Sequence, residues 1–290
     1  MTGIQSHPMF LDSEPREQKR AIARFYDRLS PHFRRLWGPH LHDGYYRTGR
    51  EDRELAQQQL VEFLAERARV LRGCTVLDIG CGMGATSVWL AEHLGCRPTG
   101  ITLSQVQVDM ARELARERRV DADFRVMDAA HLDFAGTFDL VWMVGVLGHL
   151  PDQHAFLSES GRLLRSGGRF LLADWTLADS VSPSDFARFV EPTLRGMLMP
   201  QIVSAGEYVR WFEAAGLRTV EVVDITNETR PTWDKGLKIV QAPAVLRLAL
   251  QLGSDAVELL AAVGHMRRAM RKGLIRYSVL VAQKPDSDPT

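Results

Sequence analysis

The sequence predicts an α/β protein built on a seven-stranded, mostly parallel sheet. From Cys74 onward, short apolar runs alternate with amphipathic stretches, which is typical of a parallel sheet covered by helices on both faces. A glycine-rich turn, Gly80 to Gly84, follows the first apolar run and precedes a helical pattern. With 290 residues and 45% hydrophobic content, the chain can bury the core of one large domain with additions, or of two small domains.

The strands follow from the apolar runs and their spacing. A helix is expected over 104–118, where Val106, Met110 and Leu114 recur every four residues behind a capping box. Further helices are expected over 152–165, ending at a Ser-Gly-Gly turn, and over 205–215. The predicted strands are 75–79, 97–102, 122–127, 138–144, 169–174, 218–225 and 275–283.

The chain divides into an arm and a core. Residues 1–72 are expected to form an N-terminal helical arm or lid, with two helical segments around an aromatic, His-rich stretch. Residues 73–290 form the core, which insertions at about 176–203 and 226–273 interrupt. Insertions at the ends of strands are natural lids over an α/β site, so we expect them to cap it.

The composition excludes several classes of protein. The 36 basic and 36 acidic residues balance, so no nucleic-acid partner is expected. The three cysteines lack the spacing of a zinc site or a disulfide framework, and no metal is expected. No apolar run reaches the roughly 18 residues that span a bilayer, so we expect no stable membrane insertion. Residues 1–20 lack the apolar core of a secretory signal, and a reduced, cytoplasmic protein is expected.

The turn after the first strand leaves two cofactors open. Three glycines in the seven residues 78–84 let backbone N–H groups approach a ligand closely. Gly80, Gly82 and Ala85 also satisfy the dinucleotide fingerprint. A nicotinamide enzyme, however, needs an acid at the end of the second strand, where residues 101–104 read Ile-Thr-Leu-Ser. The sequence therefore favours a different nucleoside.

An acid two residues before the first glycine, with a third glycine two after the second, resembles the S-adenosylmethionine (SAM) loop of class I methyltransferases, a Rossmann-like fold. The resemblance implies SAM as cofactor. It implies that Asp78 acts through the loop and the methionine end of SAM, while Gly80, Gly82 and Gly84 make room for it. The other implied cofactor contacts are Thr102, Leu103, Gln107, Asp128, Ala129 and Gly145.

The closest resemblance is to the tocopherol methyltransferase-like group, and it spans roughly residues 20–284. The segments that carry it are 24–27, 36–46, 100–107, 204–208 and 268–284. That group contains enzymes acting on prenylated phenols, alkaloid nitrogens and terpenoid carbons. The resemblance therefore implies a transferase in natural-product biosynthesis with a small lipophilic acceptor.

Three residues are candidates for catalysis. His149, in a loop after the fourth strand, is the best general-base candidate, although a structural histidine near the site is the alternative. Gly145 and Gly148 stand where related enzymes have acids, so a role for acids there is in doubt. In related O-methyltransferases an Asp at position 174 partners this histidine; a helix cap or a solvated strand end is the alternative. Tyr26 is the third candidate.

Aromatic residues are expected to line the acceptor pocket: Trp37, Tyr45, Tyr46 and Trp175. Trp37 is equally consistent with helix packing. Residues 242–272 predict either a lid helix with a cationic end or a surface that touches a membrane. A homo-oligomer is compatible with the sequence.

The sequence thus predicts SAM-dependent methyl transfer to a small hydrophobic acceptor: a prenylated aromatic, a terpenoid or an alkaloid. Methylation of carbon or nitrogen is favoured. The alternatives are O-methylation of a sugar or phenol hydroxyl and, more remotely, a SAM-binding protein without catalysis.

Overall fold

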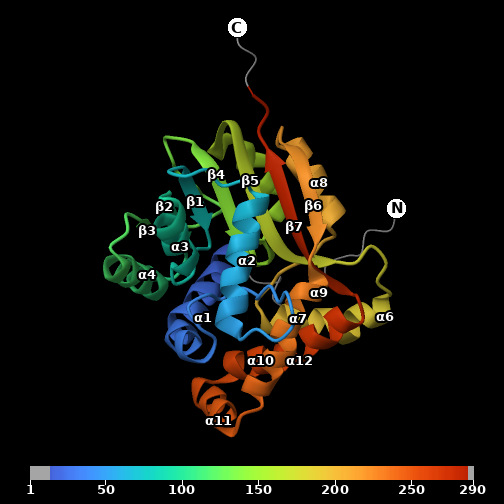
Figure 1. The fold of residues 1–290 in the computed structure, drawn as a ribbon. Coiled ribbons are helices and arrows are strands. Elements are labelled where there is room, and N and C mark those ends of the chain that lie inside the picture. Colours follow the sequence, from blue (N-terminus) through green and yellow to red (C-terminus); the bar gives the residue numbers. More distant parts are fainter. Residues whose placement is uncertain (1–13, 287–290) are drawn as a thin grey trace.

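The computed structural model describes residues 14–286 and contains the predicted seven-stranded sheet (Figure 1). The start of the predicted arm, including most of the segment examined for a secretory signal, lies outside the described residues, as do residues 287–290. The strand order is β3-β2-β1-β4-β5-β7-β6. The strands are β1 Thr75–Ile79, β2 Arg97–Thr102, β3 Asp123–Val126, β4 Phe138–Val144, β5 Leu164–Leu177, β6 Arg218–Asp224 and β7 Ile275–Gln283.

The topology places a crevice beside β1. Strands β1 to β5 are parallel, and β7 runs antiparallel between β5 and β6. The chain builds outward from β1 through β2 to β3, then returns to the other side of β1 with β4 and β5. Such a reversal of strand order opens a crevice at the carboxyl ends of the strands, where α/β proteins bind ligands.

Helices cover both faces of the sheet, because successive strand residues point to opposite sides. On one face, Val76 and Trp142 pack with α2 (Arg53–Arg67) and α12 (Ser254–Arg271). On the other face, Leu77 and Val141 pack with α5 (Gln153–Glu159) and α8 (Ala205–Ala214). Near β2 and β3, α3 (Ala85–Leu94) and α4 (Gln105–Arg118) share a smaller cluster.

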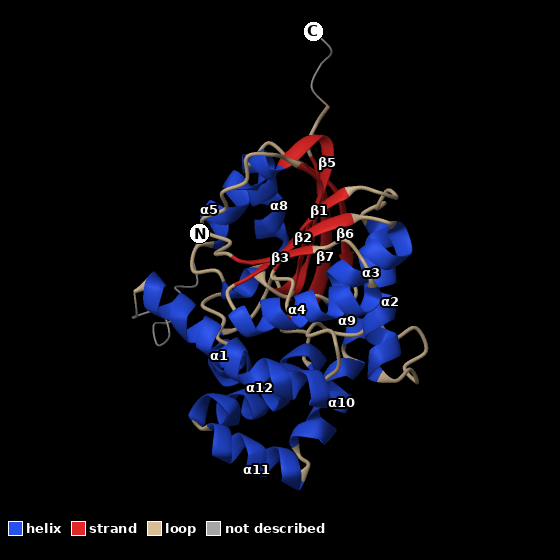
Figure 2. Cartoon of the chain, turned by 90° about the vertical axis from the view of Figure 1, so that its left-hand side faces the viewer, coloured by secondary structure: helices blue, strands red, loops and turns tan. Residues whose placement is uncertain are grey.

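The remaining helices gather at one end of the sheet and form the cap (Figures 1 and 2). Among residues 14–286, no helix has the length and apolar character needed to cross a membrane. The predicted lid region is helical, and Leu250 on α11 is exposed. The cap helices are α1 Pro15–Leu36, α6 Pro183–Asp185, α7 Glu191–Gly196, α9 Thr226–Thr229, α10 Pro231–Val240, α11 Pro243–Leu252 and the start of α12.

One predicted boundary is wrong. The helix expected over 152–165 ends at Glu159, a 3-10 turn covers Ser160–Leu163, and β5 begins at Leu164 rather than at residue 169. Gly167 has a φ of +72°, and its N–H donates to the carbonyl of Lys284 in the C-terminal segment. The register between β4 and β5 shifts at this level. The Ser-Gly-Gly segment is therefore an irregularity inside a strand and not a helix end.

Candidate active site

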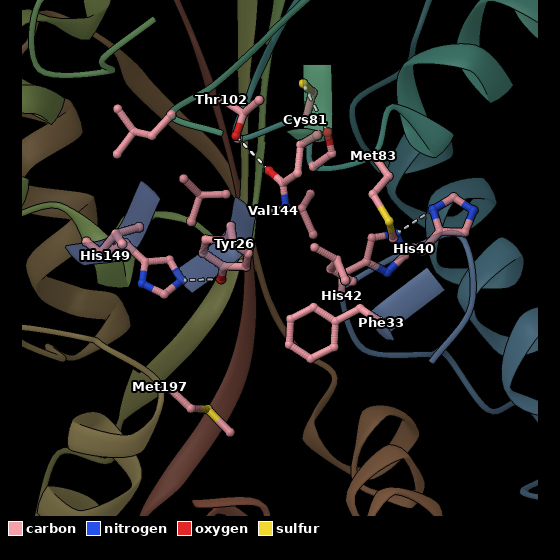
Figure 3. A pocket seen from close by; sticks show the side chains of 18 of the residues that line it. Tyr26, Phe33, His40, His42, Cys81, Met83, Thr102, Val144, His149 and Met197 are labelled. Carbon is pink, nitrogen blue, oxygen red and sulfur yellow. Dashed lines mark hydrogen bonds between the residues drawn. The ribbon is translucent and has the colours of Figure 1, made fainter. Parts of the chain in front are cut away.

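A cavity of about 290 Å³ lies between the carboxyl ends of the strands and the cap (Figure 3). Its walls come from the turn after β1, the ends of β2 and β4, and the cap helices α1, α10 and α12. All but one of the residues expected to bind the cofactor line it. They are Asp78, Gly80, Gly82, Thr102, Leu103, Gln107, Asp128, Ala129 and Gly145.

The exception is Gly84, because the glycines of the turn have different tasks. A Cβ on Gly80 would lie 2.2 Å from Cγ2 of Val146, so this position must be bare for the turn to meet the loop after β4. A Cβ on Gly84 would lie 2.6 Å from Cβ of Ala111 on α4. Gly84 therefore makes room for helix packing and, contrary to expectation, does not line the cavity. Of the three, Gly82 has the most space and faces the cavity.

Polar groups beside the turn are paired within the protein. The hydroxyl of Ser87 donates to Oδ2 of Asp78 over 2.6 Å, and burial raises the pKa of Asp78 to about 7. The hydroxyl of Thr102 donates to Oε1 of Gln107 (2.7 Å), whose amide donates to Ser30 on α1 (3.1 Å). These bonds connect the sheet edge to the cap and fix the cavity wall.

Asp128 meets a partner that the sequence did not indicate. Nζ of Lys19, on α1, donates to its Oδ2 over 2.5 Å, and the N–H of Ala130 donates to its Oδ1. Burial opposes ionisation of Asp128, but these bonds lower its pKa below the usual value. Lys19 lines the cavity, so one cationic side chain of the cap reaches the strand end.

His149 and Tyr26 point toward one another across one wall of the cavity (Figure 3). Nδ1 of His149 lies 3.0 Å from the carbonyl oxygen of Leu198, and a carbonyl can only accept, so Nδ1 carries the proton. Nε2 then accepts from the hydroxyl of Tyr26 over 3.0 Å. Burial lowers the pKa of His149 and raises the pKa of Tyr26. The pair is a neutral base hydrogen-bonded to a neutral phenol.

The position of Tyr26 depends on the next residue of α1. Oδ1 of Asp27 accepts from the hydroxyl of Ser104 (2.6 Å) and from the N–H of Val106 (3.2 Å). Asp27 thereby docks α1 onto the N-terminus of α4, where backbone N–H groups favour a carboxylate. This docking carries Tyr26 to the cavity.

Asp174 does not partner His149. Its Oδ2 accepts from the N–H groups of Val146 (3.1 Å) and Leu147 (2.8 Å), and its Oδ1 accepts from the N–H of Trp175. Burial raises the pKa of Asp174 to about 6, and these backbone bonds limit the rise. The carboxyl does not line the cavity. It holds the loop that carries His149, so the predicted pairing is wrong.

Two of the four aromatic residues expected in the pocket line it, namely Trp37 and Trp175. Tyr45 instead stacks on Phe63 of α2, with ring centroids 4.6 Å apart. Tyr46 is buried outside the cavity, and its N–H donates to the carbonyl of Glu228. The chain after Asp43 runs along α2, which keeps both tyrosines out of the cavity. The expectation that they line the pocket is therefore wrong.

Several site residues were missed. Asp43 lines the cavity, and its Oδ2 accepts from Nε1 of Trp175 over 2.8 Å. Tyr277 was missed as well, and it lines the same region together with Trp233. Asp43 falls within segment 36–46, which carried part of the resemblance, but nothing local in the sequence brings it to residue 175. Within residues 14–286, no group of three or more His, Cys, Asp and Glu is placed to hold a metal ion.

Comparisons with known proteins agree with this geometry. Residues 76–168 match the model of a methyltransferase domain family. The 27-O-demethylrifamycin SV methyltransferase of Amycolatopsis mediterranei is 31% identical over 91% of this chain and 97% of its own. The chloroplastic tocopherol O-methyltransferase of Arabidopsis thaliana is 26% identical over 92% of this chain and 82% of its own. The crystal structure of the cyclase SpnF superposes with a TM-score of 0.81 at 26% identity, over 93% of this chain and 97% of that one.

Proposed function

Because this chain belongs to the class I SAM-dependent methyltransferases, close to the tocopherol methyltransferase group, we propose that it methylates a small, largely apolar natural product. The rifamycin and tocopherol enzymes are both named for natural products, which supports this acceptor class. Apolar side chains from the cap support it further, because they form the wall opposite the strand ends. They include Ile22, Phe25, Phe33, Met197, Val240, Leu260 and Val263.

The residues around the turn fit SAM, which supplies an electrophilic methyl group on a sulfonium. Gly82 leaves a bare backbone facing the cavity, and Asp78 offers a buried carboxyl beside it. We infer that this turn holds the methionine end of SAM and that Asp128 and Ala129 hold its adenine side. Lys19 would then share Asp128 with the cofactor. Arm 1–72 and the insertions 176–203 and 226–273 would cover both ligands.

The pair formed by His149 and Tyr26 carries the chemical part of the proposal. An acceptor hydroxyl that is methylated must lose a proton, and so must a carbon. In this geometry the proton passes to the oxygen of Tyr26 while Tyr26 gives its own proton to Nε2 of His149. A neutral amine needs no such base in the attacking step. The pair therefore favours methylation of oxygen or carbon over that of nitrogen.

The test incubates the purified protein with SAM and a panel of prenylated phenols, terpenoids and macrocyclic alcohols. We expect S-adenosylhomocysteine to form with at least one acceptor class, together with a product heavier by one methyl group. His149→Ala, run in parallel, should bind SAM and form little product. A folded protein that binds SAM but makes no S-adenosylhomocysteine with the whole panel would favour the non-catalytic alternative.

A further inference from the structure

Asp43 is a buried carboxyl with one oxygen unused. The residue is 2% exposed, and Oδ2 accepts from Nε1 of Trp175. Oδ1 has no hydrogen-bond partner, although the residue lines the cavity. A buried polar atom without a partner destabilises the fold, so its presence beside the cavity points to a ligand that satisfies it.

Aromatic rings surround this carboxyl on the cavity side. The rings of Trp175 and Trp233 lie 5.7 Å apart at 63°, and Tyr277 approaches Trp175 at 6.5 Å and 81°. Trp37 continues the series at 6.4 Å from Trp233. Angled ring faces around an acid are the arrangement that binds ammonium groups, because each face attracts positive charge. The hydroxyl of Tyr277 and Nε1 of Trp233 also lack partners.

The charges facing Asp43 are of one kind. The titratable side chains that act on it or feel it electrostatically are Asp174, Tyr46 and Tyr277, which are acids or phenols. His42 precedes it in the chain, and burial lowers the pKa of His42 to about 4, so that ring is neutral near pH 7. No basic side chain of residues 14–286 forms an ion pair with Asp43. Without such a partner, burial raises the pKa of Asp43 to about 8, and a bound cation is the complement that would ionise it.

Asp43 comes from the segment whose Leu41 packs beside Gly82 of the turn, whereas the rings of the group stand over other strands. Trp175 and Tyr277 sit opposite one another on β5 and β7, and β4 lies between β5 and β1. Neighbouring strands are about 4.8 Å apart, so β5 and β7 lie roughly 10 and 14 Å from β1. The acceptor side of the cavity is therefore the place for this cation.

We propose that Asp43, Trp175, Trp233 and Tyr277 form a subsite that binds a cationic amino group of the acceptor, away from the atom that is methylated. The ammonium N–H donates to Oδ1 of Asp43, and the rings cover its alkyl groups. This inference rests on the proposed function, since it describes the acceptor of that reaction. It narrows the acceptor to lipophilic molecules that carry a basic amine.

The experiment measures binding and needs no turnover. The full chain, loaded with S-adenosylhomocysteine, is titrated at about pH 8.5 with N,N-dimethylbenzylamine and with isobutylbenzene, its neutral carbon isostere. At this pH Asp43, with its pKa of about 8, is largely ionised and the amine is still mostly protonated. We expect the native protein to prefer the amine by roughly tenfold or more, since hydrogen bonds to charged groups are of that strength. Asp43→Asn, which keeps the shape and an acceptor for Trp175, should lose that preference while still binding isobutylbenzene.

Two further variants test whether the preference for the amine depends on this subsite. Asp185→Asn removes an exposed carboxylate of α6 and should leave the preference unchanged. Trp233→Leu keeps an apolar side chain but removes a ring face, and should weaken amine binding severalfold. Equal binding of both probes to the native protein, or a preference that survives in Asp43→Asn, would overturn the inference.

Two further readouts separate the possible failures. If Asp43→Asn weakened SAM alone, the cation would be the sulfonium, and if it weakened SAM and S-adenosylhomocysteine alike, the cation would be their α-ammonium group. Either result would mean that the amine subsite is wrong. If the native protein preferred the amine but methylated no acceptor, the subsite would stand and the proposed reaction would fall.

Discussion

The two halves of the cavity treat their polar atoms in opposite ways. In the half at the ends of β1, β2 and β3, which we propose for the cofactor and call the cofactor half, Asp78, Thr102 and Asp128 all have partners within the protein. In the acceptor half, over β5 and β7, Oδ1 of Asp43 and the hydroxyl of Tyr277 have no hydrogen-bond partner. The first half is complete before any ligand arrives. The second leaves hydrogen bonds for the ligand to make, which is how a site discriminates among acceptors.

The largest effect is expected where the halves meet, at His149. His149→Ala should lower kcat by roughly 10²–10⁴-fold, because the proton of the acceptor loses its destination. Formation of S-adenosylhomocysteine measures this, and calorimetry should show unchanged SAM affinity. Tyr26→Phe is the milder companion and should retain part of the activity. An active His149→Ala protein would mean that the acceptor needs no base.

The pH dependence of activity also tests the role of His149 as a base. Burial lowers the pKa of His149 below its ordinary 6.5, so the neutral ring predominates at pH 7. We expect kcat, measured with SAM and acceptor both saturating, to be flat near neutrality and to fall only as the solution becomes more acidic than that ordinary value. A profile that still rises above pH 7 would assign the titrating group elsewhere.

Gly80→Ala tests whether the cofactor half is preassembled. The new Cβ would meet Val146 at 2.2 Å on a backbone with φ of +72°, so we expect a loss of about 3 kcal/mol of stability and of most SAM binding. Gly95→Ala is the matched control, since its φ is +64° but nothing lies within 4 Å. It should cost about 1 kcal/mol and spare SAM binding. Equal effects would mean that backbone strain, not contact with Val146, matters at position 80.

Asp43→Asn probes the acceptor half through stability. Burial raises the pKa of Asp43 to about 8 from 3.8. Between these values the unfolded chain has released a proton that the folded chain keeps, so native stability falls as pH rises through this window. Asparagine does not titrate. The variant without ligand should therefore match the native protein near pH 3.8 and exceed it by about 1 kcal/mol or more near pH 8.

Thermal unfolding of both proteins across this pH range checks the expectation. A variant that is less stable than the native protein at pH 8 would mean that Asp43 is ionised and satisfied without a ligand.

The smallest effect is expected at Lys19. Its ion pair with Asp128 is partly exposed, with side chains 19% and 29% accessible, and such pairs contribute about 0–1 kcal/mol. Lys19→Met should shift SAM affinity by less than about fivefold, and calorimetry will give the sign. A loss of SAM binding beyond tenfold would make Lys19 a direct part of the cofactor half.

These contrasts also explain what could be predicted from the sequence. The turn 78–84 and the strand ends are local signals, so the sheet and the family followed from them. They also led to residues that line the cavity, all but one of those expected at the cofactor. The acceptor half is assembled from distant segments: Asp43 meets Trp175 across 132 positions of the chain. Asp174 was misassigned because its backbone partners in the loop after β4 have no sequence signature. The placement of Tyr45 and Tyr46 depended on how α2 covers the chain.

The carbonyl of Leu198 has a consequence beyond orienting one ring. Leu198 has a φ of +53°, which is unusual for a residue other than glycine. It packs with Phe25 and Leu29 on α1, the helix that carries Tyr26. The insertion 176–203, which contains Leu198, thus determines the tautomer of His149 in the loop after β4. Replacing residues 176–203 with a different insertion could reverse the tautomer of His149, so that Nε2 donates a hydrogen bond instead of accepting one. The strands would not change. A new insertion between two strands would therefore be enough to change the chemistry of this fold.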